Sequence, residues 1–418
     1  MGDKLFEAYA CRESGTSFSA KWPALIARPG PLYQKEGDVR TAFTRDYTRI
    51  LHCCAFRRLK HKTQVFFNIN NDHVCTRMEH VFHVDSVSNT IADALGLNTD
   101  LTRAIALGHD LGHAPFGHQG ENILNKLSQT YCNTSFWHEK NGLRVVDHLE
   151  LLADLQNVSR NLDLTYAVRD GIISHCGEIT SQSIFPRDEL IDLATIQEAN
   201  QYSPATWEAC VVKMADKIAY IGRDLEDAER LGFFSEQEKT FLQDMARATG
   251  QGAINTTAIM HNLIIDICAS STPKNGICLS AKAHAQLKEV SAFSTRTIYN
   301  HPRLAPFKAY AALVLNQIFS FLFEQYQPAD TLSRLLAVNQ GNSKLAVSFV
   351  KWISCYCDPD FVKSSIEASH FRTPEHLANE KIYGCLNSQS LYAQAILDYI
   401  SGMTDRYAIE AFDELITL

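Results

Sequence analysis

The chain has 418 residues, of which 45% are apolar and 21% are charged, so it can bury a large core. Glycine (20 residues) and proline (12 residues) are both rarer than in an average protein, which disfavours a turn-rich β-sandwich and favours helix. The 39 basic and 47 acidic residues give a net charge of −8, which argues against a protein that mainly coats nucleic acid, although a local basic groove is compatible with it.

Cysteine usage and hydropathy bear on where the protein works. None of the 12 cysteines forms a Cys-x-x-Cys pair, so we interpret them as reduced thiols rather than a zinc ribbon or a redox dithiol. The start MGDKLFEAYACRESG carries no export signal. The most apolar window, residues 309–323, contains polar residues and is shorter than the roughly 18 residues that a membrane span needs. We therefore predict a cytoplasmic protein that does not act at a membrane.

One hairpin and two helices are predicted in the first part of the chain. Residues 1–50 contain three prolines and show no long helical pattern. Residues 65–67 and 74–76 are β-favouring runs on either side of Asn/Asp turn residues, which predicts a short hairpin and the only notable sheet. Apolar residues then recur with helical spacing from His80 to Leu95, and a second helix follows over residues 101–109.

Helical periodicity dominates the rest of the chain, so the expected fold class is all-α with a small β-hairpin. Polar stretches divide the sequence into an irregular N-terminal segment (1–45), a catalytic helical core (46–247) and a C-terminal helical extension (248–418). The predicted helices beyond residue 140 cover 141–155, 163–175, 206–230, 235–248, 252–269, 280–297, 305–325 and 385–416.

A dense histidine cluster is the first sign of chemistry. The segment GHDLGHAPFGHQGE places His109, His113 and His118 within ten positions, far more than 16 histidines in 418 residues would give by chance. Its glycines allow the sharp turns and close backbone approach that a ligand-binding segment needs.

Two further residues complete a candidate metal site with this cluster. His80 lies at the head of a predicted helix, and Asp216 lies inside the helical segment VVKMADKIAYIGRDLED. Together with His109 and Asp110 they supply imidazole and carboxylate groups, which suit Mn, Fe, Co, Ni or Zn better than Mg. Four protein ligands leave positions for water and substrate.

The ordered set His80, His109-Asp110 and Asp216 resembles the H…HD…D signature of HD-domain phosphohydrolases. Five segments narrow the resemblance to the deoxyguanosine triphosphate triphosphohydrolase family: RRLKHKTQVF, TRMEH, HDLGHAPFGHQGE, ADKIAYIGRDLED and DYISGMTDRYAIEAFDEL. They occur in the family's order from Arg57 to Asp413. Residues 1–45 and 177–204 match no segment that we can place.

The resemblance implies an HD-domain helical fold and an enzyme that cleaves deoxynucleoside triphosphates, dGTP among them. Water attacks the α-phosphorus, and the products are deoxynucleoside and inorganic triphosphate. A divalent metal is expected (Mn, Mg, Fe, Co, Ni or Zn), as is a homo-oligomer of two to six chains. Activation by a nucleotide effector stays open, and no feature indicates nucleic-acid binding.

Catalytic roles follow from the resemblance. It places His113 and His118 at the scissile phosphate, where imidazole suits proton transfer near neutral pH. His118 is the better candidate for protonating the leaving 5′ oxygen, and Glu121, three residues on, would orient it. His138 in FWHEKNGLR corresponds to a further active-site histidine.

Substrate contacts follow in the same way. Asp216, Tyr220 and Asp224 step by four residues and so form one stripe on a helix. The resemblance implies that Tyr220 packs on the deoxyribose and that Asp224 accepts a hydrogen bond from the 3′-hydroxyl. The same resemblance implies sugar contact by Gln64, and phosphate contact by Arg77 and Lys217.

Each interpretation has an ordinary alternative. The metal set could be caps and buried polar groups, and residues 170–175 are expected to be structural. For the others the alternatives are loop hydrogen bonds (His113, His118), a structural histidine (His138), a surface ion pair (Arg77), core packing (Tyr220) and an exposed hairpin amide (Gln64). At the level of function, the alternatives are an HD-type phosphomonoesterase or cyclic-nucleotide phosphodiesterase and a non-catalytic nucleotide-binding regulator.

Overall fold

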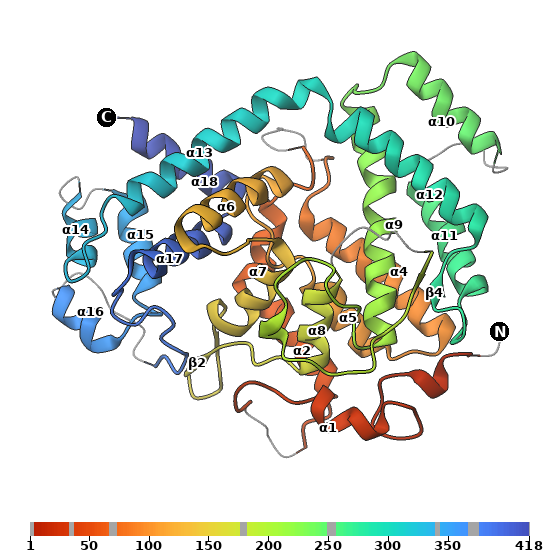
Figure 1. The fold of residues 1–418 in the computed structure, drawn as a ribbon, viewed down its shortest axis with the longest axis horizontal. Helices are drawn as coiled ribbons and strands as arrows, with labels where there is room; N and C mark the ends of the chain where they lie inside the picture. Colours follow the sequence, from red (N-terminus) through yellow and green to blue (C-terminus); the bar gives the residue numbers. More distant parts are fainter. Residues whose placement is uncertain are drawn as a thin grey trace.

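The computed structural model describes residues 4–32, 37–66, 73–175, 182–248, 256–338, 343–366 and 376–417. Its regular structure is almost entirely helical (Figure 1), so the all-α prediction is confirmed. Strands among these residues form two short antiparallel pairs, β1 (Leu152–Ala153) with β2 (Ser159–Arg160) and β3 (Ser183–Ile184) with β4 (Ile277–Cys278).

The N-terminal region is more helical than predicted, because α2 (Ala42–His52) begins within the segment expected to be irregular. Thr41 Oγ1 accepts a hydrogen bond from Thr44 N at 3.0 Å and caps its first turn. Phe43 and Ile50 are buried on one side of it. The sequence itself carries a helical pattern here, because Phe43, Tyr47, Ile50 and Leu51 recur at helical spacing, and the expectation of an irregular segment up to residue 45 overlooks it. The neighbouring short helices are η1 (Glu7–Tyr9), η2 (Ser19–Lys21), α1 (Trp22–Leu25), α3 (Cys54–Arg58) and η3 (Leu59–His61).

The centre of the molecule is a bundle in which α4 (Arg77–Leu95) packs on α5 (Thr99–Gly108) and α9 (Trp207–Arg230). In α4 a capping box fixes the first turn, where Thr76 and Glu79 each bond the other's backbone N–H. The surrounding helices are α6 (Gly117–Cys132), α7 (His138–Arg144), the π-helical turn η4 (Val145–Leu149) and α8 (Tyr166–Ser174).

The C-terminal helices cover this bundle. α13 (Ala305–Phe323) arches over it in Figure 1 and packs on α6, α17 (Gln389–Ser401) and α18 (Asp405–Ile416). The others are α10 (Glu236–Ala248), α11 (Thr256–Ser270), α12 (Ala281–Ser294), the π-helical turn η6 (Thr295–Tyr299), η7 (Pro302–Leu304), α14 (Thr331–Ala337), α15 (Lys344–Ile353) and α16 (Pro359–Ser365).

Helix boundaries were predicted unevenly. The predictions 206–230 and 235–248 lie within one residue of α9 and α10. The predicted helix 385–416 is instead two helices, because Thr404 Oγ1 accepts from Tyr407 N at 3.1 Å and starts a new one. The predicted helix 141–155 ends at Leu149, before β1, and the start predicted at residue 252 lies outside the described residues.

The hairpin predicted around residues 65–76 is wrong for the described part of that segment. Residues 67–72 lie outside the described residues, and the flanks meet only in an isolated bridge between Thr63 and Thr76. Beyond this bridge, residues of the two flanks contact other elements. Cys75 N donates to Asp227 Oδ2 at 2.8 Å, and Phe66 packs on Phe233 of the α9–α10 turn.

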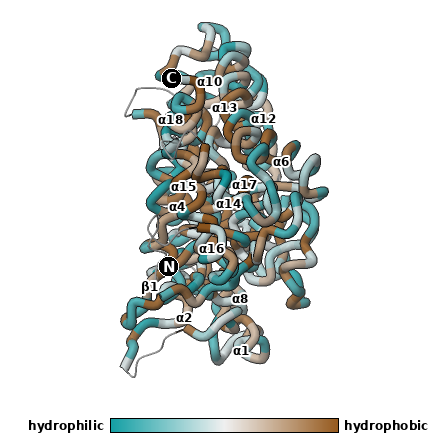
Figure 2. The backbone as a smooth tube through the Cα atoms, turned by 90° about the vertical axis from the view of Figure 1, so that its left-hand side faces the viewer, coloured by the Kyte–Doolittle hydropathy of each residue, from teal (hydrophilic) through white to brown (hydrophobic). Residues whose placement is uncertain are grey.

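From the side (Figure 2) the molecule is thinner than in Figure 1, and apolar stretches run through its middle. One stretch, Pro302–Phe323, is long and apolar enough to cross a membrane by length and composition alone; an 18-residue window within it has a mean hydropathy of 1.2 and is 33% buried. This stretch is longer than the apolar window at residues 309–323 because η7 runs directly into α13. Its buried side, which includes Val314, Ile318 and Leu322, belongs to the protein core.

Candidate active site

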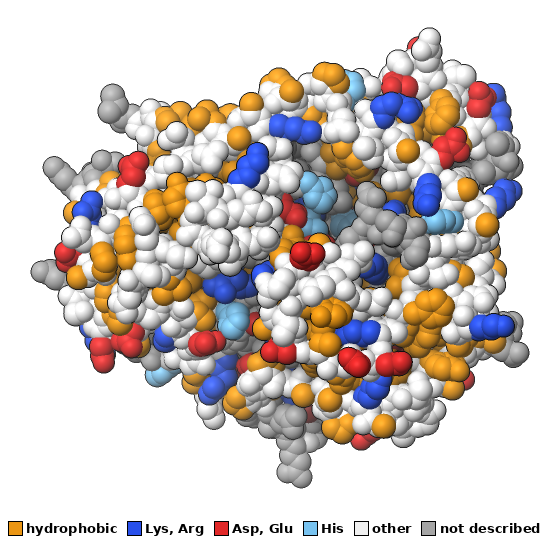
Figure 3. All heavy atoms as spheres, in the orientation of Figure 1, with side chains coloured by type: hydrophobic (Ala, Val, Ile, Leu, Met, Phe, Trp, Pro, Cys, Tyr) orange, Lys and Arg blue, Asp and Glu red, His pale blue; other side chains and the backbone are white. Residues whose placement is uncertain are grey.

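Histidine side chains gather in a hollow near the middle of the face shown in Figure 3. A cavity of about 470 Å³ opens here between α4, the α5–α6 turn, α7, α9 and η6. This volume is usual for a small-molecule site. All of the candidate residues except His109 and Glu121 line it; the lining residues are Gln64, Val65, Arg77, His80, Asp110, His113, His118, His138, Glu139, His175, Lys213, Asp216, Lys217, Tyr220, Asp224, Ser291, Thr295 and Tyr299.

Two helices supply much of this lining. Asp216, Tyr220 and Asp224 lie one helical turn apart on α9, and all three face the cavity. Arg77 and His80 lie one turn apart at the start of α4. The packing of α4 on α9 therefore brings the two sets together.

The turn after α5 supplies His109, Asp110 and His113. At Gly112 this turn lies so close to α7 that a Cβ atom would be 2.0 Å from His138 O. Only glycine permits this approach. As a result, the ring centroids of His113 and His138 are 3.7 Å apart.

The four residues of the predicted metal set converge at the base of the cavity. His80 Nε2 lies 2.9 Å from Asp216 Oδ1 and 3.4 Å from His109 Nε2. His109 Nε2 lies 3.7 Å from Asp216 Oδ1 and 3.8 Å from Asp110 Oδ1. The structure thus brings together residues from α4, the α5–α6 turn and α9 that are far apart in sequence.

The donor set fits a divalent metal. His109 Nδ1 lies 2.7 Å from the carbonyl oxygen of Ala106, so this nitrogen carries the proton and donates. Its Nε2 is left as a lone pair that points toward His80 and the carboxylates. A hydrogen bond from the second ring nitrogen is typical of metal-binding histidines, and two imidazoles with two carboxylates suit a divalent transition metal.

Asp110 is held by two neighbours outside the metal set. Arg77 Nη1 donates to both of its carboxylate oxygens at 3.1 Å, and His113 Nδ1 lies 2.7 Å from Oδ1. Burial opposes the charged carboxylate, but Arg77 together with His113 and His109 outweighs it and keeps the pKa of Asp110 well below its usual value. Burial and Arg77 also lower the pKa of His113, which is therefore neutral at pH 7.

Glu121 on α6 lies between His118 and His138 and contacts both. Its Oε2 lies 3.0 Å from His138 Nδ1 and 3.6 Å from His118 Nδ1, so its closer partner is His138 rather than His118. Burial opposes a charge on His138, but Glu139 and Glu121 raise its pKa to about 9. His138 is thus protonated at pH 7, while His118, at 74% side-chain exposure, lies at the mouth of the cavity.

The cavity lining also includes the residues proposed to bind the sugar. Asp224 Oδ2 accepts a hydrogen bond of 2.6 Å from Tyr299 OH, and burial raises the pKa of Asp224 to about 7. Gln64 and Tyr220 line the cavity as well. Gln64 Oε1 is buried and has no hydrogen-bond partner among the described residues, so it is an acceptor ready for a donor on a ligand.

Comparison with known proteins agrees with this site. Residues 77–221 match the HD domain family, and residues 368–414 match the phosphohydrolase-associated domain family. A deoxyguanosinetriphosphate triphosphohydrolase-like protein of Desulfatibacillum aliphaticivorans is 34% identical over 90% of this chain and 88% of its own. Proteins of that name from Caldanaerobacter subterraneus and Bartonella quintana are both 32% identical, over 91% and 92% of this chain and 87% and 91% of their own.

The chain belongs to the deoxyguanosinetriphosphate triphosphohydrolase-like family. Its HD domain makes it a metal-dependent phosphohydrolase. The HD match spans the residues that build the base of the cavity, from Arg77 to Tyr220. The domain boundaries at residues 45 and 247 and the role of each site residue stay predictions.

Several lining residues of this phosphohydrolase were not among the sequence candidates. His175 is the clearest: its ring lies 5.1 Å from that of His109, and its Nδ1 lies 2.7 Å from Ile172 O. We had expected it to be structural. The sequence could have indicated Glu139 as a site residue, because it follows His138 directly. It could not have indicated Tyr299, because the contact of Tyr299 with the α9 stripe depends on how η6 packs.

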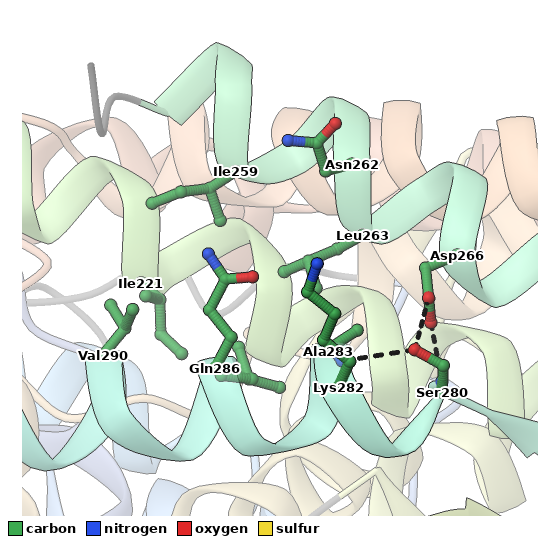
Figure 4. A pocket seen from close by; sticks show the side chains of 11 residues that line it. Ile221, Ile259, Asn262, Leu263, Asp266, Ser280, Lys282, Ala283, Gln286 and Val290 are labelled. Atoms are coloured by element: carbon green, nitrogen blue, oxygen red, sulfur yellow. Dashed lines mark hydrogen bonds between the residues drawn. The ribbon is translucent and has the colours of Figure 1, made fainter. Parts of the chain in front are cut away.

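A second, smaller cavity of about 190 Å³ lies between α9, α11 and α12 (Figure 4). Its walls are mainly apolar, including Ile221, Leu263 and Val290. The acid in it, Asp266, is already occupied, because Ser280 donates to it through its N–H at 2.7 Å and its hydroxyl at 2.6 Å. No histidine lines this cavity, whereas five histidines line the cavity of about 470 Å³.

Proposed function

We propose that this phosphohydrolase cleaves deoxynucleoside triphosphates, dGTP among them, into deoxynucleoside and inorganic triphosphate. The observation that carries the proposal is the set of groups that line the large cavity (about 470 Å³). The lining combines three members of the metal set (His80, Asp110 and Asp216), the cations Arg77 and Lys217, and an acid, an amide and two tyrosines (Asp224, Gln64, Tyr220 and Tyr299). A deoxynucleoside triphosphate matches all three kinds of group, because its α-phosphate lies between the anionic β- and γ-phosphates and the deoxyribose.

His80, His109, Asp110 and Asp216 would hold a divalent metal, which when bound polarises a phosphoryl oxygen and lowers the pKa of a bound water. Arg77 keeps Asp110 ionised and in place. Lys217 lines the cavity beside Asp216 and would add positive charge for the polyphosphate.

The histidines divide the proton chemistry between them. His138, charged at neutral pH, would stabilise negative charge that develops on the phosphate, whereas neutral His113 can accept a proton. His118, at the mouth, would protonate the leaving 5′ oxygen. Glu121 would support this acid and hold His138 in its charged form.

The sugar would lie against α9 and η6. Tyr220 would pack on the deoxyribose, and Asp224 and Gln64 would bind the 3′-hydroxyl. Buried acceptors of this kind favour a substrate that brings a donor, because an unmade hydrogen bond is costly. A metal-dependent dNTP hydrolase in the cytoplasm, assembled from several copies of the chain, is the form that we propose for the active enzyme.

The test is to incubate the protein with each dNTP, with and without Mn²⁺ or Mg²⁺, and to separate the products. We expect deoxynucleoside and intact triphosphate, and ¹⁸O from labelled water in the triphosphate. Orthophosphate with a dNDP would instead show attack at the γ-phosphate. Hydrolysis only of nucleoside monophosphates or cyclic nucleotides would favour the alternative HD enzymes, and binding without turnover would favour a regulator.

A further inference from the structure

The turn between α17 and α18, residues 401–405, lies against two segments that carry active-site residues. It belongs to the tail DYISGMTDRYAIEAFDEL and to the region that matches the phosphohydrolase-associated domain. None of its residues lines the large cavity. Its contacts with that cavity are therefore indirect.

Asp405 joins these two segments through one buried carboxylate, with the residue 6% exposed. Oδ1 accepts from Phe116 N at 2.9 Å. Oδ2 accepts from Thr63 N at 3.1 Å and from Thr63 Oγ1 at 2.6 Å. Thr63 directly precedes Gln64, and Phe116 stands two residues before His118.

The turn at Phe116 needs such a support. Phe116, which precedes α6, has a φ of 63°, and Gly117, the first residue of α6, has a φ of 58°, so two consecutive residues are left-handed where the helix begins. This conformation is unfavourable for a residue with a bulky side chain. A charge-assisted hydrogen bond to the Phe116 N–H holds it in place. The two segments are also close, because a Cβ on Gly117 would be 3.1 Å from Gln64 O.

Lys62 makes a second connection to the same turn. It is 2% exposed, and its Nζ donates to the carbonyl oxygens of His113 and Ser401, the latter at 2.8 Å. Its own carbonyl oxygen accepts from Arg77 N at 3.0 Å. The side chain of Lys62 thus joins the histidine turn to the end of α17, and its backbone carbonyl oxygen bonds the start of α4.

We propose that residues 401–405 are a positioning element for the active site, acting through Asp405 and Lys62. They fix the place of His113 and His118 relative to Gln64, and so align the phosphate end of the cavity with the sugar end. This role deepens the proposed function and rests on it. It gives the C-terminal region a purpose in catalysis without any contact with substrate.

The test compares Asp405→Asn with a matched control, Asp46→Asn. Asp46 is also a buried carboxylate, and it accepts from the N–H and hydroxyl of one threonine, Thr165, and from Arg28. Neither of these partners lines the large cavity. Both substitutions keep the shape of the side chain and remove one carboxylate charge. Asp46 also pairs with the Arg28 guanidinium, whereas the hydrogen bonds to Asp405 come from neutral donors, so Asp46→Asn should destabilise the fold at least as much as Asp405→Asn.

Three quantities are measured: amide hydrogen exchange without substrate, bound metal, and kcat and KM for dGTP. We expect faster exchange over residues 62–66 and 113–118 in Asp405→Asn only, with metal content unchanged. We expect kcat/KM to fall about tenfold to a hundredfold in Asp405→Asn, as for misplaced catalytic groups, and to stay near wild type in Asp46→Asn. Unchanged exchange in both segments, or equal losses in the two variants, would overturn the proposal.

The exchange measurement separates this proposal from the proposed function. A wild-type protein that leaves dNTPs intact would refute the function, yet exchange would still report whether Asp405 orders the two segments. If Asp405→Asn does not fold, Thr63→Val replaces it, with Thr165→Val as its control. Thr63→Val removes one donor to Asp405 and should lower kcat/KM about fivefold, the value of one hydrogen bond, with a smaller rise in exchange. A loss no greater than that of Thr165→Val would count against the positioning role.

Discussion

Glu121 Oε2 lies 3.0 Å from His138 Nδ1, and this contact holds a buried imidazole in its charged form. Burial alone would lower the pKa of His138, but Glu139 and Glu121 raise it to about 9. A histidine with a raised pKa stays protonated as the pH rises through neutrality and loses its proton only near that value.

Replacing Glu121 with Gln should therefore lower the pKa of His138. If the charged form is needed, the alkaline limb of kcat/KM against pH should move to lower pH in Glu121→Gln. Glu236→Gln, which changes a surface glutamate on α10, is the control and should keep the wild-type profile. An unmoved alkaline limb in Glu121→Gln would show that protonated His138 is not required.

Removal of a metal ligand should abolish activity, and the choice of ligand should decide the cost in stability. Asp110→Ala leaves the buried Arg77 without its carboxylate, and breaking such a pair costs about 3 to 5 kcal/mol. Asp216→Asn breaks no pair with an arginine or lysine among the described ion pairs. Both should lose bound metal and activity by orders of magnitude.

Metal analysis and thermal unfolding distinguish these effects. Only Asp110→Ala should show a large fall in Tm in the presence of a chelator. Retention of stoichiometric metal by either variant would contradict the ligand assignment.

The metal set could be proposed from sequence because His80, His109-Asp110 and Asp216 occur in the order of a known family signature, and the structure brings these distant residues together. The spacing of Asp216, Tyr220 and Asp224 likewise follows from helix geometry, and they share one wall in the structure. Tyr299 and His175 could not be predicted in this way. Their roles depend on which helices pack together, and a single tyrosine or histidine beside apolar residues is usually part of the core.

Long-range packing also explains why the hairpin prediction is wrong and why the contacts made by Asp405 and Asp227 were not predicted. Thr63 and Cys75 belong to a segment with good strand propensity, but Asp405 and Asp227 accept their backbone N–H groups instead. Distant side chains competed with the local pairing, and no local pattern reveals that competition.

Asp224 predicts a pH dependence of stability. Burial raises its pKa from 3.8 to about 7, so the folded protein keeps a proton that the unfolded chain releases. Between pH 3.8 and about 7 the folded protein binds more protons than the unfolded chain. The contribution of Asp224 to the free energy of unfolding therefore falls as the pH rises through this range. Tyr299, His80, Asp227 and Arg77 are the groups that act on this carboxyl.

Asp224→Asn removes this titration. Relative to wild type, the Tm of the metal-free variant should therefore increase as the pH rises from 5 to 7, and the difference should level off above about 7. The measurement is thermal unfolding in a chelating buffer over this range. A difference that does not change with pH would show that Asp224 is already ionised when folded.

Sugar selectivity is expected from the same wall of the cavity. A 2′-hydroxyl placed against Tyr220 would be buried without a partner, at a cost of about 1 to 3 kcal/mol, which gives roughly tenfold to a hundredfold preference for dGTP over GTP. At the 3′ carbon the effect is reversed, because a dideoxy substrate leaves Gln64 Oε1 without a donor and Asp224 with Tyr299 alone, so it should be turned over poorly. Tyr220→Ala should relax the first preference and Asp224→Ala the second, with metal content unchanged in both. The measurement is kcat/KM for dGTP, GTP and dideoxy-GTP at one fixed metal concentration, and equal values for GTP and dGTP in the wild-type protein would show that α9 does not line the sugar site.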